Sequence, residues 1–291
     1  YRELVDGLET GLARLVQPFR WLVHTLNRNN KLGSRRNIAA HYDLGNDFFE
    51  LFLDETLTYS CAYFEQDDMS LAEASRAKYD RICRKLDLSP EHHLVEIGSG
   101  WGGFAIHAAQ RYGCQVTTTT ISQEQCELAK KRIRLAGLSD RITVLLCDYR
   151  DIKGEYDRLV SIEMIEAVGH QYFPTYFETC AKLLHPEGLA AIQTITILDD
   201  QYEQARKEVD FIKRYIFPGS CIPSITTLLS AAKQTDLRIA HTEDFAAHYV
   251  RTLREWRHRF NQRDTEIAAL GFDIWFRRIW DFYFSYCEGG F

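Results

Sequence analysis

The sequence has no apolar run near the roughly 20 residues needed to cross a membrane. Its first residues lack the charged-then-apolar pattern of a signal peptide, so any membrane contact is expected to be peripheral. Basic residues are not in excess: the net charge of −6 argues against a general nucleic-acid binder. None of the eight cysteines forms a C-x-x-C pair or has zinc-ligand spacing, so we expect reduced thiols, a cytoplasmic protein and no metal site.

What the sequence does have is an apolar strand, a glycine-rich turn and a helix start in direct succession at residues 93–103, HLVEIGSGWGG. Gly98 and Gly100 let the backbone turn sharply and approach a ligand, and the helix that begins at Gly103 offers unpaired N–H groups. Glu96 provides an acceptor near the end of the strand. This pattern predicts a site for a nucleotide cofactor.

The segments that follow distinguish between two cofactors. A dinucleotide site would place an acidic residue at the end of the second strand, about 20 residues after the glycine turn. The expected second strand, residues 115–121 (QVTTTTI), has no carboxylate there. The third, residues 142–147, runs instead into Asp148 and Tyr149, an acceptor beside an aromatic surface suited to adenine. The pattern favours S-adenosylmethionine (SAM) over NAD.

The hydrophobic periodicity alternates between helix and strand from about residue 70 to 197, which predicts a doubly wound α/β sheet. Strands are expected near 93–97, 115–121, 142–147, 157–162 and 189–197, and helices near 70–87, 103–112, 123–136 and 173–184. Residues 1–27 predict an amphipathic helix, and residues 28–65 are irregular and rich in aromatics. Residues 199–235 are expected to be a helical insertion that caps the substrate, before a strand from Arg238 to Phe245 resumes the sheet.

Further segments lie outside the glycine turn, in this order: residues 41–46 (HYDLGN), 59–64 (YSCAYF), 161–170 (SIEMIEAVGH), 215–219 (YIFPG), 248–256 (HYVRTLREW) and 286–287 (YC). Together they resemble the cyclopropane-fatty-acid synthase family of SAM-dependent methyltransferases, which includes the mycolic-acid cyclopropane synthases, over roughly residues 35 to 291. The resemblance implies a Rossmann-like class I SAM-dependent methyltransferase domain at 70–291, with the helical insertion near 199–235. Residues 1–69 are then the N-terminal helix and active-site lid segment.

The resemblance also implies the reaction, in which a methylene carbon passes from SAM to the double bond of an unsaturated phospholipid acyl chain. An alkene is a poor nucleophile, so the sulfonium methyl must be held in line with the π bond in a dry apolar pocket. A cyclopropane ring forms when the resulting carbocation loses a proton, and the family holds a bicarbonate ion as the base. Two alternatives remain: a C-methyltransferase forming methyl- or methylene-branched chains, and a lipid-binding protein without enzymatic activity.

Carried over by position, the bicarbonate site consists of the Cys61 N–H, the side chains of Glu166 and Tyr249, the backbone near Ile195 and the side chain of Gln193. The cyclopropane synthases carry a histidine at that last position. Glutamine forms hydrogen bonds but carries no charge, which predicts weaker or reoriented anion binding. Glu166 is expected in a buried setting that raises its pKa.

Two further positions carry expectations. Glu163 is expected to be structural or to lie near the cofactor. Cys287 matches a cysteine near the active site of related enzymes, with no requirement that it act as a nucleophile.

The resemblance places Tyr59 and Ser60 over the methionine end of SAM, Gly98, Gly100 and Trp101 along its amino-acid and ribose part, Thr120 and Gln125 near the ribose hydroxyls, and Asp148 and Tyr149 against adenine. The acyl pocket is expected among Phe211, Tyr215, Phe217, Trp256, Phe276, Trp280, Tyr283 and Cys287.

The expected partners are phospholipid acyl chains at the inner membrane surface and, for an exposed sheet edge, a second copy of the chain. That edge is expected because the family usually continues into a further antiparallel strand.

Overall fold

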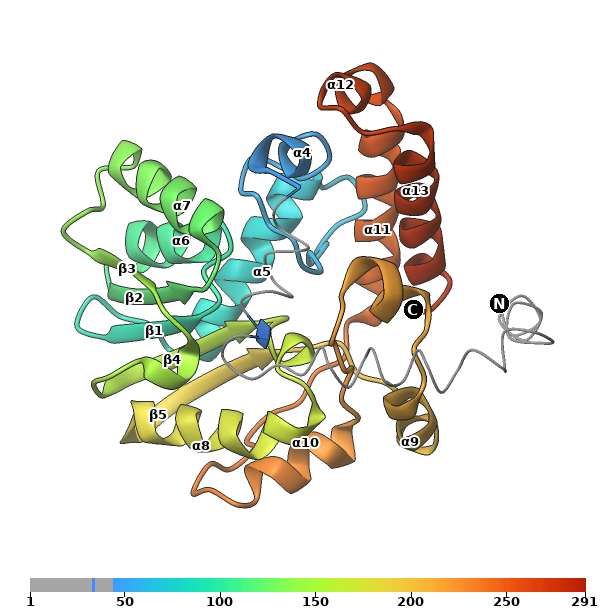
Figure 1. Ribbon diagram of the computed structural model, residues 1–291. Coiled ribbons are helices and arrows are strands. Elements are labelled where there is room, and N and C mark those ends of the chain that lie inside the picture. Colours follow the sequence, from blue (N-terminus) through green and yellow to red (C-terminus); the bar gives the residue numbers. More distant parts are fainter. Residues whose placement is uncertain (1–32, 35–43) are drawn as a thin grey trace.

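The computed structural model describes residues 33–34 and 44–291. The helix predicted at residues 1–27 lies outside the described residues. At the centre is a parallel sheet in the order β3-β2-β1-β4-β5 (Figure 1). Its strands are β1 (His93–Ile97), β2 (Gln115–Thr120), β3 (Ile142–Leu146), β4 (Tyr156–Ile162) and β5 (Leu184–Gln193). The predicted α/β class is confirmed, and the strand order reverses direction between β1 and β4, where ligands of such sheets bind.

Helices cover both faces of the sheet (Figure 1). One apolar cluster joins the sheet to α5 (Leu71–Lys85), α6 (Gly103–Tyr112) and α7 (Gln123–Leu135), and another joins it to α8 (Phe173–Leu183) and α10 (Ile225–Ala232). Local sequence sets these helix boundaries. Ser70 and Glu73 form a reciprocal capping box at the start of α5, and Gly113 ends α6 in the left-handed conformation at φ 72°.

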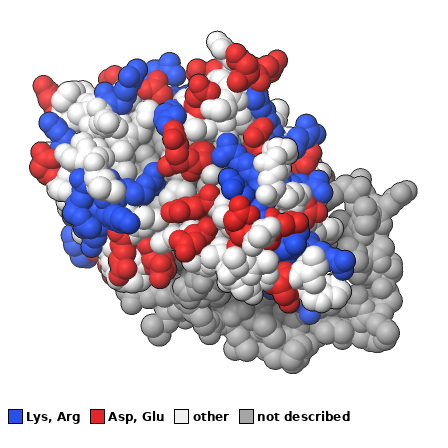
Figure 2. Space-filling view, turned by 90° about the horizontal axis from the view of Figure 1, so that it is seen from above, with Lys and Arg blue, Asp and Glu red and all other residues white. Residues whose placement is uncertain are grey.

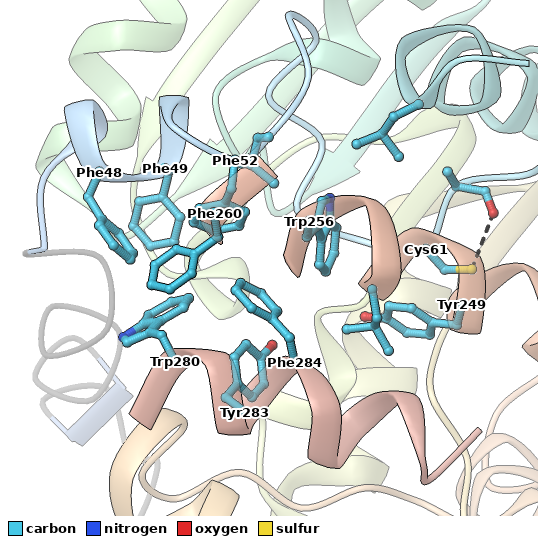
Figure 3. Packing of buried hydrophobic residues seen from close by; sticks show 14 of the residues in the cluster. Phe48, Phe49, Phe52, Cys61, Tyr249, Trp256, Phe260, Trp280, Tyr283 and Phe284 are labelled. Carbon is cyan, nitrogen blue, oxygen red and sulfur yellow. Dashed lines mark hydrogen bonds between the residues drawn. The ribbon is translucent and has the colours of Figure 1, made fainter. Parts of the chain in front are cut away.

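A third layer lies over the carboxyl ends of the strands. It contains the short helix α4 (Asn46–Glu50), α9 (Asp199–Lys207), a π-helical turn (Ile212–Ile216), and the C-terminal helices α11 (Ala246–Asn261), α12 (Asp264–Ala269) and α13 (Ile274–Glu288). Three aromatic residues of α4 and the turn after it, Phe48, Phe49 and Phe52, face the rings of α11 and α13 (Figure 3). Edge-to-face contacts hold them, such as Phe48 to Trp280 with ring centroids 4.7 Å apart.

Short 3₁₀ turns connect the main elements. One, Tyr149–Asp151, follows β3, and two more, Ile165–Ala167 and His170–Tyr172, lie between β4 and α8. They place the residues after β3 and β4 at the carboxyl edge of the sheet.

The insertion at 199–235 differs from the prediction, because its helices are separate and only part of it covers the sheet edge. The α10 helix packs on α8 beside the sheet, and Ala231 and Ala232 are buried there. The cap is therefore α9, the π-helical turn and the C-terminal helices.

The strand predicted from Arg238 to Phe245 is wrong: this segment belongs to no strand. Its charged side chains fix it elsewhere, because Glu243 pairs with Arg81 and Lys85 of α5. Asp244 then accepts a hydrogen bond from the backbone N–H of Ala246 at the start of α11. The segment thus lies against α5, and β5 forms the edge of the described sheet.

Acidic and basic side chains are interspersed on the face seen in Figure 2. The arginines that crowd α11 are paired within the protein: Arg254 with Glu288 and Arg257 with Asp281 of α13. Within the described residues, no helix is both long and apolar enough to span a membrane.

Candidate active site

A cavity of about 520 Å³ lies at the carboxyl ends of β1 and β4, between the sheet and the cap. The sheet contributes the glycine turn after β1 and the polar residues after β2 and β3. The cap contributes mainly apolar and aromatic side chains, among them Phe217, Leu253 and Tyr283. The cavity thus has a polar end suited to a cofactor and an apolar end suited to a hydrocarbon chain.

The glycine turn requires its glycines. Gly98, Gly100 and Gly102 all have positive φ, at 94°, 47° and 83°. A Cβ on Gly98 would lie 2.4 Å from Cγ of Met164, in the turn after β4. A side chain at this position would therefore displace the β4 turn, which carries the acidic residues of the site.

All ten residues predicted to bind the cofactor line this cavity: Tyr59, Ser60, Glu96, Gly98, Gly100, Trp101, Thr120, Gln125, Asp148 and Tyr149. Two of them are joined by a hydrogen bond, which the Thr120 hydroxyl donates to Oε1 of the buried Gln125 at 2.8 Å. The side-chain amide of Gln125 and the carboxylate of Asp148 offer donors and acceptors for ribose hydroxyls and an adenine amino group, and the glycine turn leaves room for the backbone to approach the ligand, so the residues fit SAM.

Two carboxylates at this end have different environments. Glu96 is buried at the end of β1 and accepts a hydrogen bond from the Thr118 hydroxyl at 2.6 Å, and burial raises its pKa to about 7. Asp148 is held by the guanidinium of Arg150 through two 2.7 Å contacts. Asp148 therefore faces the cavity as half of an ion pair, which fixes its orientation.

Beyond the glycine turn, four predicted catalytic residues lie around the turn after β4. Three hydrogen-bond donors converge there on Glu163. The Cys61 N–H and the Gln193 amide donate to its Oε1, at 2.9 and 2.8 Å, and the Tyr249 hydroxyl donates to its Oε2 at 2.7 Å. Cys61 and Tyr249 lie side by side at the edge of the aromatic cluster (Figure 3). Three of the groups predicted to surround the anion thus lie together, but in this structure they contact Glu163 and not Glu166.

Glu166 is held separately, three residues along the same turn. Its Oε1 accepts hydrogen bonds from the Ile195 N–H at 2.5 Å and the Thr194 hydroxyl at 2.9 Å, and its Oε2 is buried without a partner. Burial, and then the charge of Glu163, raise the pKa of Glu166 to about 8, as expected from the sequence. At neutral pH the turn therefore carries one neutral carboxyl group beside Glu163.

These features match a family defined by sequence. The profile of the family described as mycolic acid cyclopropane synthetase matches residues 29–291. The chain belongs to this family. The predicted resemblance is thereby confirmed.

Within the family, the chain is 45% identical over 268 residues to the tuberculostearic acid methyltransferase of Mycobacterium tuberculosis, covering 89% of this chain and 62% of that protein. It is 38% identical to the cyclopropane-fatty-acyl-phospholipid synthase of Escherichia coli, covering 86% of this chain and 63% of the relative. The chain thus spans less than two thirds of the length of these relatives. A solved mycolic acid cyclopropane synthase, in complex with SAH and CTAB, superposes with a TM-score of 0.82 at 32% identity, covering 88% of this chain and 92% of that one.

Burial disfavours the thiolate form of both cysteines of the site. Burial raises the pKa of Cys287 to about 12 and that of Cys61 well above its usual range. The Cys61 thiol donates to the Ala62 carbonyl at 3.2 Å. The contribution of Cys61 to the site is its backbone N–H.

The predicted acyl-pocket aromatics divide into two groups. Phe217, Tyr283 and Cys287 line the cavity. Trp256 and Trp280 are buried in the aromatic cluster instead, and Tyr215 is 51% exposed. Only three of the eight residues predicted for the acyl pocket therefore line the cavity.

Sequence reasoning missed the roles of two residues. Glu163 is one, because nothing in the pattern distinguishes it from Glu166. The other is Lys78 of α5, a buried amine that donates to the Ser60 hydroxyl and whose pKa burial lowers to about 8. Periodicity could have found Lys78, since it lies on the same apolar face as Leu71 and Ile82.

Proposed function

We propose that this protein transfers a carbon from SAM to the double bond of an unsaturated lipid acyl chain. The observation that supports this best is the cavity itself, in which the cofactor end continues into an apolar space that contains the carboxyl groups of Glu163 and Glu166. An alkene needs no polar recognition, only exclusion of water and alignment with the methyl donor.

SAM supplies an electrophilic methyl group, and the alkene π pair forms the new carbon–carbon bond while the sulfur keeps the electron pair of its broken bond. The chain's own residues then have two tasks. The rings of Tyr59, Phe217 and Tyr283 line the cavity where the cation forms, and their electron-rich faces stabilise positive charge. A base at the turn after β4 takes the proton that leaves the cation.

The substrate we propose is a phospholipid, as in the name of the Escherichia coli relative. Ring closure to a cyclopropane is the first candidate product, named in that relative and in the solved neighbour. A methyl or methylene branch is the second candidate. It is favoured by the tuberculostearic acid methyltransferase, at 45% identity, and by Gln193 in place of histidine. Peripheral contact with the inner membrane surface, a cytoplasmic location and a homodimer belong to the same proposal.

The test is mass spectrometry of unsaturated phospholipid vesicles incubated with the protein and isotope-labelled SAM, with fragmentation to locate the added carbon. A labelled CH₂ bonded to both carbons of the former double bond supports ring closure. A labelled methyl or methylene group bonded to only one of these carbons supports a branch. Measurable SAM binding without any labelled lipid contradicts the proposal and favours a lipid-binding role.

A further inference from the structure

The donors assigned to a bicarbonate ion are already occupied in this protein. Cys61, Gln193 and Tyr249 each direct a hydrogen to Glu163, over distances of 2.7 to 2.9 Å. Each of these donors has a single proton directed at the site, and an ion placed there would have to displace the Glu163 side chain or lie against its negative charge. The residues present do not fit a separate bicarbonate.

The Glu163 carboxylate has the same planar pair of oxygens as bicarbonate, and it receives donors on both. Oε1 accepts from Cys61 and Gln193, and Oε2 accepts from Tyr249. Gln193 suits this arrangement better than a histidine. Its neutral amide donates a hydrogen bond to the carboxylate but cannot compete with it for a proton.

The backbone at Glu163 is held in an unfavourable conformation to achieve this. Its φ is 50°, in the left-handed region that residues with a Cβ rarely adopt. The Glu163 N–H donates to the Gln193 carbonyl at 2.8 Å, which fixes the turn to β5. Non-glycine residues persist in this conformation where surrounding contacts impose it, and they cluster at functional sites.

The neighbouring ionisable groups leave Glu163 as the acceptor. The pKa of Glu166 is raised to about 8 and that of Tyr249 well above its usual value, so both keep their protons at neutral pH. The Cys61 thiol is protonated as well. Lys78 is also nearby and is electrostatically coupled to Glu163, so it balances part of the negative charge.

We infer that Glu163 is the base of the reaction and replaces bicarbonate, so that this protein needs no exogenous anion. The inference rests on the proposed function, since a base is needed only if a cation forms on the acyl chain. For ring closure, a C–H bond of the transferred methyl breaks, its electron pair forms the second carbon–carbon bond, and Glu163 takes the proton. For a methylene branch, a 1,2-hydride shift comes first, and the electron pair of the C–H bond becomes the new π bond.

The test compares three proteins in CO₂-free buffer, with and without bicarbonate or formate, on vesicles of an unsaturated phospholipid. Wild-type product formation should change less than twofold when bicarbonate is removed. Glu163→Gln should lower product formation by about 10²- to 10⁴-fold while leaving SAM affinity within a few-fold. The matched control Glu178→Gln, on the exposed side of α8, should retain full activity.

Glu163→Gly provides a chemical rescue. Glycine accepts the positive φ, so the variant leaves the three donors facing a space the size of a carboxylate. We expect little product in CO₂-free buffer and at least a tenfold increase when formate or bicarbonate is added. Dependence of the wild type on bicarbonate, or full activity of Glu163→Gly without any anion, would overturn the inference.

A binding measurement separates this inference from the proposed function. ¹³C-formate should bind Glu163→Gly but not the wild type, and the added substitution Tyr249→Phe should weaken that binding. The inference would be contradicted if formate also bound the wild type and Tyr249→Phe weakened that binding as much as it weakens binding to Glu163→Gly. This result would count against the inference even if no lipid product forms in any buffer. Absence of product with the expected formate binding would instead contradict only the proposed function.

Discussion

At the scale of single residues, Glu166 makes stability depend on pH. Its pKa is about 8 in the folded protein against 4.5 for the free side chain, so between these values the folded state binds a proton that the unfolded chain has released. The free energy of unfolding therefore falls as pH rises from about 4.5 to 8. Glu166→Gln removes the ionisable group, and its amide oxygen can keep the Ile195 and Thr194 donors.

We expect Glu166→Gln to be more stable than wild type at pH 8, on the order of 2 kcal/mol, and about equal near pH 4.5. Urea unfolding at both pH values measures the difference, with Glu178→Gln as the control for loss of a surface charge. Equal stability of wild type and Glu166→Gln at pH 8 would show that Glu166 is not held neutral.

Glu163 and Glu166 show which features of the site cannot be predicted from the sequence. The glycine turn and the residues after β2 and β3 could be predicted because each lies within a few residues of a strand end, and strand ends meet at one edge of a parallel sheet. Which of Glu163 and Glu166 meets Cys61 and Tyr249 depends on one backbone angle, the positive φ of Glu163. Among residues with a Cβ, a positive φ is enriched in Asn, Asp and His, so a glutamate gives no indication of it.

At the scale of elements, the segment before α11 shows a limit of sequence-based prediction. A strand was expected from Arg238 to Phe245, where the sheet would resume after the insertion, but the ion pairs of Glu243 with Arg81 and Lys85 fix the segment on α5. Arg81 also lies over the ring of Tyr63, 4.6 Å from its centroid, and the Tyr63 ring lies 4.4 Å from that of His248 in α11. Arg81 of α5 thus contacts Glu243 in the segment before α11. It also contacts Tyr63, which in turn packs on His248 at the start of α11.

This arrangement predicts an acid-sensitive contribution to stability. The hydrogen bonds from Arg81 hold the pKa of Glu243 at about 2 against 4.5 for the free side chain, so the stabilisation is present above pH 4.5 and is lost as pH falls toward 2. Because the pair is partly solvent-exposed, Glu243→Gln should cost about 1 kcal/mol or less at pH 7. Urea unfolding should show the difference from wild type shrinking between pH 5 and pH 3. A constant difference would mean that packing, not charge, holds the segment.

At the scale of the whole molecule, the cavity joins two parts with separate cores. The sheet and its helices have an apolar cluster on each face, whereas α4, α11 and α13 share the aromatic cluster around Trp280. A ligand in the cavity touches the glycine turn on one side and Tyr283 of α13 on the other. Binding of SAM should therefore stabilise the sheet and the cap together.

Trp280→Ala tests this coupling, because Trp280 is buried and its ring contacts those of Phe48, Phe260 and Phe284. Removing it should cost about 3–5 kcal/mol in the cap. SAM at 100 times its Kd should stabilise the wild type by about 2.7 kcal/mol by mass action. If Trp280→Ala loosens the cap while the sheet stays folded, the same SAM concentration should stabilise the variant less, since part of the cavity wall is lost.

Thermal unfolding of both proteins with and without SAM gives the comparison, and Phe282→Ala is the matched control because Phe282 lies on the same helix but is 39% exposed. A smaller SAM-induced increase in Tm for Trp280→Ala than for Phe282→Ala would show that the cap contributes to cofactor binding. An equal increase in both variants would place the whole binding energy on the sheet side. The cap would then serve only the acyl chain, and variants of α13 should change lipid selectivity without changing SAM affinity.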